Sequence, residues 1–344
     1  MPQSSLNAKN RRSSASTSLL TTLVVSSGIA VALFALPSII AIDLHFTGAE
    51  PAKQAFPVTV NPQARTITED PRVEALLNPP EKTSLQAAAG LASNVITELA
   101  SFIASLPVYH MLAGSAASGL VTIRPGYRQE EVATAFAREL SWNPTQKAAF
   151  LRQLKVAEPI IPEGQLVPGV YAVRGLMAPG DVQIMLDERF NQEIEARYST
   201  STAELVPLDD TLTIASMLER ETSDPTEMRL ISGIIWNRLW KGMNLQIDAT
   251  LQYAKASSNK SVTTWWPQVK PADKYIKSAY NTYQNKGLPP GPIASPSTAA
   301  VLAALNPKKT DCLFYFHDRN SDFHCTATYK EHVVLLKKYY GQGK

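Results

Sequence analysis

Two patterns of apolar residues follow each other along the chain, one on each side of about residue 206. In the first, Val132, Phe136 and Leu140 recur at helical spacing, and shorter apolar runs are bounded by Pro-Gly turns. The predicted elements are a strand at 120–124, helices at 129–140 and 144–154, a strand within 162–173 and a helix at 179–198. Residues 120–205 thus form a predicted β-α-α-β-α module, which we interpret as a small binding domain.

The second pattern, from 206 to 344, predicts helices followed by a C-terminal β-hairpin. Asp224, Pro225 and Glu227 occupy the N-cap, first and third positions that are typical of a helix start. A preceding helix ends close by, so we expect a junction between two helices, a common place for a cleft. The predicted elements are a helix capped by Asp209, Asp210 or Thr211 and ending near Thr222, a helix to about Trp240, a strand at 243–247, a helix from Ser295 and Pro296 to just before Asn306, hairpin strands at 312–316 and 323–327, and a helix at 329–340.

Glu221 is the most informative residue in this second pattern. At helical spacing it shares a face with Ile214, Met217 and Leu218, which should point inward. A carboxylate there loses water, and the nearby helix C-terminus also disfavours negative charge, so its pKa should rise. A carboxylic acid that stays protonated near neutral pH can act as a general acid.

Two further considerations bear on Glu221. Its neighbour Glu219 has only Ala215 and Ser216 behind it, so Glu219 should be the more hydrated of the two. Periodicity alone also allows an ordinary structural role, in which Glu221 forms a salt bridge at the helix end with Arg220 or Arg238.

The N-terminal region predicts a membrane anchor. Residues 13–42 contain no charged residue, and 19–42 are apolar over a length that can span a bilayer. Because Lys9, Arg11 and Arg12 precede this stretch, residues 1–18 should stay in the cytoplasm and the remainder should lie outside. A cleaved signal peptide is the alternative, although its apolar core would be shorter.

Residues 43–119 are expected to connect this anchor to the folded domains. The part from 43 to 83 is rich in proline and polar residues and is predicted to be a linker. Residues 84–106 are rich in alanine and predict a surface or interfacial helix, with a second membrane helix as the alternative.

Charge and motifs narrow the functional classes. The net charge of +3 is too small to indicate a nucleic-acid partner. No metal or nucleotide motif is found, so no cofactor is predicted. Cys312 and Cys325 flank the predicted hairpin turn; if residues 316 and 323 pair, the two cysteines are only diagonal neighbours, and either a disulfide or two free thiols is compatible with the sequence.

Several segments together resemble the endolytic murein transglycosylase family, the MltG or YceG-like proteins. Each motif alone is weak, whereas their order and spacing are specific. The segments are 215–222 with its Glu-Arg-Glu-Thr, 237–239, 242–250, 279–283, 287–296, 303–307, 313–316 and 331–332.

The resemblance implies a single-pass inner-membrane enzyme that acts on peptidoglycan outside the membrane. The family's catalytic acid is the second glutamate of Glu-x-Glu-Thr, which is Glu221 here. The implied fold class is α+β, with a transmembrane helix at 19–42, a LysM-like substrate-binding module at 120–205 and a catalytic domain at 206–344. The implied reaction cleaves the β-1,4 bond between N-acetylmuramic acid and N-acetylglucosamine and leaves 1,6-anhydro ends. The family also implies a role beside the peptidoglycan synthases in ending strand growth.

Several polar and aromatic residues offer contacts that suit a sugar groove, and each also has a structural alternative. Asp248 is the nearest possible partner carboxylate, or else a turn or helix cap; Asn281 could brace a turn, and Tyr280, Tyr283, Trp265 and Trp266 could serve packing. The candidate substrate-binding residues are Gln246, Asp248, Tyr280, Asn281 and Tyr283.

Two other functions remain open from the sequence. A muramidase-type hydrolase would use the same bond and the same Glu221, with water as the acceptor. A wall-binding scaffold without catalysis would use the anchor and the 120–205 module alone, and the intact Glu221 motif disfavours it.

Overall fold

The computed structural model describes residues 54–77, 118–158, 160–175, 177–258 and 264–341, with the single positions 99 and 103. The expected anchor at 19–42 lies outside these residues, as does all of the 84–106 helix except 99 and 103. Within the described residues, no helix has the length and apolar character of a membrane span. The chain divides into two compact units, and the larger one contains 122–170 and 177–344 together with 50–83.

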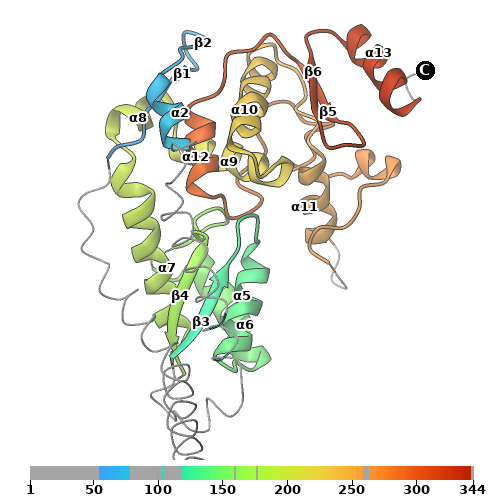
Figure 1. The fold of residues 1–344 in the computed structure, drawn as a ribbon. Helices are drawn as coiled ribbons and strands as arrows, with labels where there is room; N and C mark the ends of the chain where they lie inside the picture. Colours follow the sequence, from blue (N-terminus) through green and yellow to red (C-terminus); the bar gives the residue numbers. More distant parts are fainter. Residues whose placement is uncertain are drawn as a thin grey trace, which may run out of the picture. The chain divides into compact units, whose positions relative to one another are not determined.

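The element order predicted for residues 120–205 is confirmed, and Figure 1 labels each element. Two strands pair with each other, β3 and β4. The predicted last helix is shorter than expected, because a 3-10 turn and a further short helix follow it. The bounds are β3 Ser118–Ile123, α5 Gln129–Glu139, α6 Pro144–Val156, β4 Gly169–Arg174, α7 Pro179–Glu193, η3 Glu195–Arg197 and α8 Thr200–Leu205.

Three helices, α9 (Leu208–Glu221), α10 (Pro225–Trp240) and α12 (Thr298–Leu305), pack against one another and form the centre of the larger unit (Figure 1). Every residue of α9 from 211 to 218 is buried. A helix that is enclosed on all sides positions its end firmly. The chain after α9 therefore starts from a fixed point.

The boundaries of α9 and α10 test the capping predictions. The helix start at Asp224 is confirmed: its Oδ1 accepts hydrogen bonds from the backbone N–H groups of Thr226 at 2.7 Å and Glu227 at 2.9 Å. The start of α9 was predicted wrongly. The helix begins directly after Pro207, so Asp209 and Asp210 lie in its first turn, where negative charge complements the helix dipole.

The region after α10 differs from the prediction. In place of a strand at 243–247, a single β-bridge joins Asn244 to Lys286. A helix that the sequence reasoning missed, α11 (Asp248–Ser258), follows at once, and a 3-10 turn, η4 (Pro271–Tyr275), comes later. Leu245 and Ile247 alternate with polar residues because both side chains are buried in the core, although this segment is not part of a β-sheet.

The predicted linker is wrong for residues 54–77. They form a short hairpin, β1 (Val60–Asn61) with β2 (Thr66–Ile67), and the helix α2 (Pro71–Leu77). Phe56 and Val60 belong to the main core, and the backbone N–H of Thr59 donates to the carbonyl of Leu305 at 3.1 Å. Residues 54–77 therefore pack on the main core and contact the end of α12.

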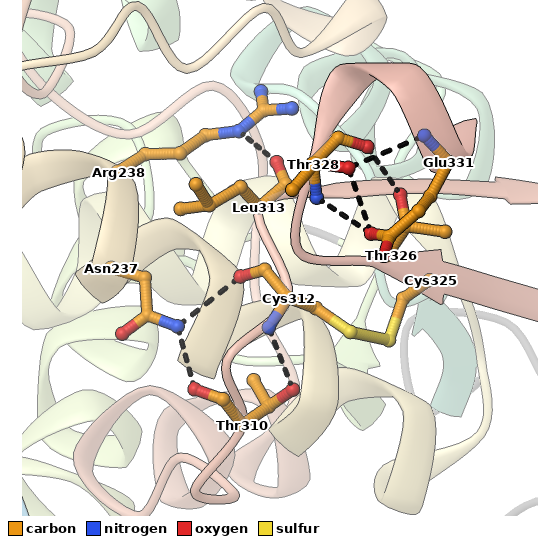
Figure 2. The surroundings of a disulfide bond; sticks show 9 residues. All are labelled: Asn237, Arg238, Thr310, Cys312, Leu313, Cys325, Thr326, Thr328 and Glu331. Atoms are coloured by element: carbon orange, nitrogen blue, oxygen red, sulfur yellow. Dashed lines mark hydrogen bonds between the residues drawn. A yellow bond between two sulfur atoms is a disulfide. The ribbon is translucent and has the colours of Figure 1, made fainter. Parts of the chain in front are cut away.

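The C-terminal hairpin consists of β5 (Phe314–His317) and β6 (Phe323–Thr326), followed by α13 (Tyr329–Tyr340). Its register pairs His317 with Phe323, one residue from the pairing considered above. Cys312 precedes Phe314, the first paired residue of β5, so the strand register does not force the two cysteines to be diagonal neighbours. It forms a disulfide with Cys325 across a Cα–Cα distance of 5.8 Å, which settles the open question about the two thiols (Figure 2).

The end of α10 contacts residues 310–313, which lead into this hairpin. The side-chain amide of Asn237 donates to the carbonyls of Thr310 at 2.8 Å and Cys312 at 3.2 Å. The next residue, Arg238, donates through Nε to the carbonyl of Leu313 at 2.7 Å (Figure 2). These contacts and the disulfide fix the position of β5 relative to α10.

Candidate active site

Glu221 is the last residue of α9, and its backbone leaves the helix at Thr222. The predicted apolar face is confirmed, because Ile214, Met217 and Leu218 are all fully buried. Glu221 itself is half-buried at the end of that face. The fold thus places one carboxyl group between an apolar core and the solvent-accessible junction of two helices.

One hydroxyl group contacts this carboxyl. Tyr315, on β5, donates a hydrogen bond from its hydroxyl to Glu221 Oε2 at 2.9 Å. Burial raises the pKa of Glu221 above its ordinary value; the bond from Tyr315 opposes that rise, and the negative charge of Asp248 adds to it. Burial, reinforced by the charge of Glu221, also raises the pKa of Tyr315 well above its ordinary value, so Tyr315 remains a donor.

The two arginines named as salt-bridge partners make other contacts. The guanidinium of Arg220 stacks 3.9 Å from the ring centre of Trp266. Arg238 is occupied by the backbone carbonyls of Leu313 and Leu245. Within the part of the chain that the structure describes, no salt bridge joins either arginine to Glu221.

Glu219 has different surroundings. Its Oε2 accepts from the backbone N–H of Ser297 at 2.9 Å and from the Ser297 hydroxyl at 2.6 Å. Ser297 is the N-cap of α12, so this carboxylate supports the start of that helix. Glu219 was expected to be the more hydrated glutamate; it is half-buried like Glu221, because the turn before α12 covers it.

Next to Glu221, a set of polar residues that the sequence did not predict consists of Thr222, Glu227 and His317. Glu227 Oε2 accepts from the hydroxyl of Thr222 at 2.7 Å and lies 3.1 Å from Nε2 of His317. A positive charge on His317 would lower the pKa of Glu221. The Thr of Glu-x-Glu-Thr therefore ties α9 to α10 and, through Glu227, to the hairpin. No sequence signal pairs these residues, because they come from three separate elements.

Two of the predicted sugar-binding residues contact each other. The hydroxyl of Tyr283 donates to Asp248 Oδ1 at 2.6 Å, and Asp248 is the first residue of α11. Asp248 and Gln246 are exposed, and Gln246 has a left-handed backbone with φ of 53° that is held by an N–H bond to the Thr282 carbonyl. The negative charge of Asp248 contributes to the raised pKa of Glu221, and the charge of Glu221 contributes to the raised pKa of Tyr283, so this pair lies near the carboxyl.

The remaining two predicted residues, Asn281 and Tyr280, contact other residues of the domain. Asn281 is completely buried, and its amide donates to the carbonyls of Lys274 at 3.1 Å and Ile276 at 2.8 Å. It braces a turn, so the prediction of a sugar contact is corrected here. Tyr280 packs on Tyr253 with ring centres 4.7 Å apart. No group of three or more His, Cys, Asp or Glu among the described residues is arranged to hold a metal ion.

Comparison with known proteins shows the family of the chain. The sequence model of the YceG-like family matches residues 97–338, a span that contains Glu221 and the hairpin. The chain belongs to the YceG-like family. A protein named endolytic murein transglycosylase from Bacillus subtilis is 31% identical over 241 residues, 64% of this chain and 64% of the relative. A protein of the same name from Streptococcus pneumoniae is 31% identical over 159 residues, 45% of this chain and 28% of the relative.

A solved structure shares this YceG-like fold. The crystal structure of a yceG-like protein from Listeria monocytogenes has a TM-score of 0.54 to this chain at 24% identity, and covers 63% of this chain and 75% of that one. The chain thus spans under two thirds of the length of the curated relatives it matches. The similarity supports the α+β fold of the described region.

Proposed function

We propose that this protein is an endolytic peptidoglycan lytic transglycosylase with Glu221 as its catalytic acid. The observation that carries the proposal is the carboxyl of Glu221, which is desolvated, has a raised pKa and is free of any salt bridge among the described residues. Family membership supports the reaction class, because relatives at 31% identity bear the name endolytic murein transglycosylase.

The first step is protonation of the leaving group. The substrate is the β-1,4 bond between N-acetylmuramic acid and N-acetylglucosamine, and protonated Glu221 donates its proton to the oxygen of that bond. Tyr315 donates to Oε2, so the acidic proton is directed to Oε1. As the proton leaves, the same hydroxyl stabilises the carboxylate that forms.

The second step closes a ring within the sugar. The bond between the muramyl C1 and the leaving oxygen breaks, positive charge builds at C1, and the muramyl C6 hydroxyl attacks that carbon. The carboxylate of Glu221 accepts the C6 hydroxyl proton, which restores its starting state. No water is consumed, so one carboxyl group suffices as acid and then as base.

Neighbouring groups are suited to position the glycan. Asp248 and Tyr283 lie near Glu221 and present a carboxylate and a phenol, and the exposed Gln246, two residues before Asp248, presents an amide. Hydroxyl and acetamido groups of a sugar need such donors and acceptors at fixed positions. We therefore assign these three residues to substrate binding, with Asp248 and Tyr283 acting as a hydrogen-bonded pair.

The proposed organisation of the whole chain follows the sequence. Residues 19–42 anchor the protein in the plasma membrane with residues 1–18 in the cytoplasm, residues 120–205 form a LysM-like glycan-binding module, and 206–344 form the extracytoplasmic catalytic domain. The disulfide fits an oxidising compartment. Peptidoglycan synthases are the proposed neighbours in the membrane, where cleavage would end strand elongation.

Digestion of isolated peptidoglycan tests the proposal. The full-length protein and its Glu221→Gln variant are incubated with peptidoglycan, and the products are read by mass spectrometry. Muropeptides lighter by one water than hydrolytic products, absent with the variant, support the transglycosylase. Ordinary reducing ends would identify a muramidase, and an absence of cleavage by folded protein would favour a scaffold.

A further inference from the structure

The strand β5 directs its side chains alternately to two different parts of the proposed catalytic domain. Phe314 and Phe316 pack against aromatic rings of α13. Tyr315, which lies between them, contacts Glu221. Because side chains of a strand alternate between its two faces, His317 lies on the same face as Tyr315.

The imidazole of His317 contacts α10 at one carboxylate. Its Nε2 lies 3.1 Å from Oε2 of Glu227, and since a carboxylate only accepts, the imidazole donates this bond. The ring of Phe323, the cross-strand partner of His317, packs edge-on against the imidazole with ring centres 5.4 Å apart. The same ring stacks on Tyr315 with ring centres 5.8 Å apart. Phe323 thus supports both side chains that β5 directs to α9 and α10.

Glu227 connects this contact to the segment that follows Glu221. The same Oε2 atom accepts from the hydroxyl of Thr222 at 2.7 Å, and the Thr222 oxygen accepts from the backbone N–H of Asp224 at 3.1 Å. Thr222 is the residue at which the chain leaves α9, directly after Glu221. The bond from His317 to Glu227 therefore acts on the backbone that carries Glu221.

Two contacts thus join β5 to the junction of α9 and α10. One holds the Glu221 carboxyl itself, and the other holds the residue after it through Glu227. A general acid must lie within hydrogen-bond reach of the oxygen that it protonates, and small displacements of such a group lower the rate strongly. A single hydrogen bond from Tyr315 does not fix the plane of the carboxyl, so the backbone at Thr222 also decides its position.

We propose that His317 is a positioning residue of the reaction, which holds the Glu221 carboxyl in place by binding Glu227. The inference rests on the proposed function for the reaction itself. In this role the imidazole acts through Glu227 rather than on the substrate. Replacement of His317 should therefore lower the rate of bond cleavage and leave the binding of the strand unchanged.

Steady-state cleavage of soluble, uncrosslinked glycan strands by the full-length protein tests this role, with release of 1,6-anhydro-muropeptides as the rate. His317→Ala should lower kcat by about 10- to 100-fold with KM unchanged, because displacement of a catalytic group lowers the rate. His317→Gln keeps a donor at the place of Nε2, so it should restore most of kcat. The matched control is His324→Ala, which removes a bond of the same kind, from Nε2 to Asp318 at 3.0 Å, and should leave kcat unchanged.

A double-mutant cycle tests whether His317 acts through Glu227. The variant that combines His317→Ala with Glu227→Ala should lose no more rate than Glu227→Ala alone, because residues of one network are not additive. The proposal is overturned by losses that multiply, by an unchanged kcat in His317→Ala, or by an equal loss in His317→Gln.

Hydrogen exchange reports on the junction without depending on cleavage. In His317→Ala, the backbone N–H groups of Thr222 and Asp224 should lose protection, whereas His324→Ala should leave their protection unchanged. Thermal melting verifies that each variant folds. Unchanged protection in His317→Ala would overturn the proposal, even if the protein proved to be a muramidase or a scaffold. Product analysis of the wild type reports separately on the proposed function, so the two can fail independently.

Discussion

Glu219 and Glu221 lie two residues apart at the end of α9 and contact two different regions of the molecule. Glu219 meets the start of α12, where an N–H and a hydroxyl of Ser297 bind its carboxylate. Glu221 meets the hairpin, where a single hydroxyl from Tyr315 contacts it. The first region stabilises a negative charge, whereas the second leaves the charge poorly solvated. Two identical side chains thus differ in their partners, which suit Glu219 to a structural role and Glu221 to the proposed chemical role.

The largest expected effect comes from Glu221→Gln. Removing the proton donor should lower the rate of peptidoglycan cleavage by about 100- to 10,000-fold, the range attributed to general acid catalysis. The rate is measured as release of 1,6-anhydro-muropeptides. Glu219→Gln is the matched control; if it abolishes cleavage equally in a folded protein, the distinction between the two glutamates is wrong.

Loss of the disulfide should weaken the Glu221 region more than the rest of the catalytic domain. Replacing Cys312 and Cys325 together by alanine opens a loop with a sequence separation of 13, and should lower the free energy of unfolding by about 3 kcal/mol. Urea denaturation measures this loss. Hydrogen exchange should show a larger loss of protection at the backbone N–H of Leu313 than at that of Ala300. Equal loss at both positions would contradict a local role for the bond.

The Tyr315→Phe variant removes the hydroxyl that contacts Glu221 and keeps the aromatic ring that packs in the domain. The plateau rate should fall by about 10- to 100-fold, because a hydrogen bond to a charged group contributes roughly 1.5–3 kcal/mol. The bond lowers the pKa of Glu221, so its loss should shift the alkaline limb of the pH–rate profile to higher pH. A profile that stays in place would mean that Tyr315 does not act on the titrating group.

Glu219→Ala should cost stability rather than activity. The N–H and hydroxyl of Ser297 would lose their acceptor, and the free energy of unfolding should fall by about 1 kcal/mol, as for a lost helix cap. Cleavage measured per folded molecule should remain close to that of the wild type. A loss of rate without a loss of stability would assign Glu219 to the chemistry.

The smallest expected effect is a pH-dependent gain in stability for Glu221→Gln. Because the folded-state pKa of Glu221 is raised, its contribution is fully present below the unfolded pKa and is lost as pH rises through the folded pKa. The variant and the wild type should therefore be equally stable in acid, and the variant should become the more stable one towards neutral pH. Thermal unfolding across this range measures the difference, and the opposite trend would indicate a lowered pKa.

Patterns of residues that lie close together in the sequence were sufficient to predict part of the fold and of the candidate site. The inward face of Glu221 and the helix start at Asp224 depend on residues a few positions apart, and both predictions are confirmed. The order of elements in residues 120–205 depends on similar short-range patterns.

Contacts between distant segments account for what was missed. Tyr315 lies 94 residues from Glu221, and nothing near either residue indicates the bond between them. The structure of residues 54–77 likewise depends on the hydrogen bond between Thr59 and Leu305. The position of Cys312 outside the ladder is set by Asn237 on α10, so pairing rules for the hairpin alone could not decide the disulfide.

Carbon-13 NMR titration of the Glu221 carboxyl tests the central claim most directly. The full-length protein is labelled at the glutamate side-chain carboxyl carbons, and the Glu221 signal is assigned by its absence from the Glu221→Gln variant. The account predicts a titration midpoint above the ordinary value of 4.5, moving higher still in Tyr315→Phe. A midpoint at or below 4.5 would show a carboxylate already ionised at the pH of the reaction, and would contradict Glu221 as the proton donor.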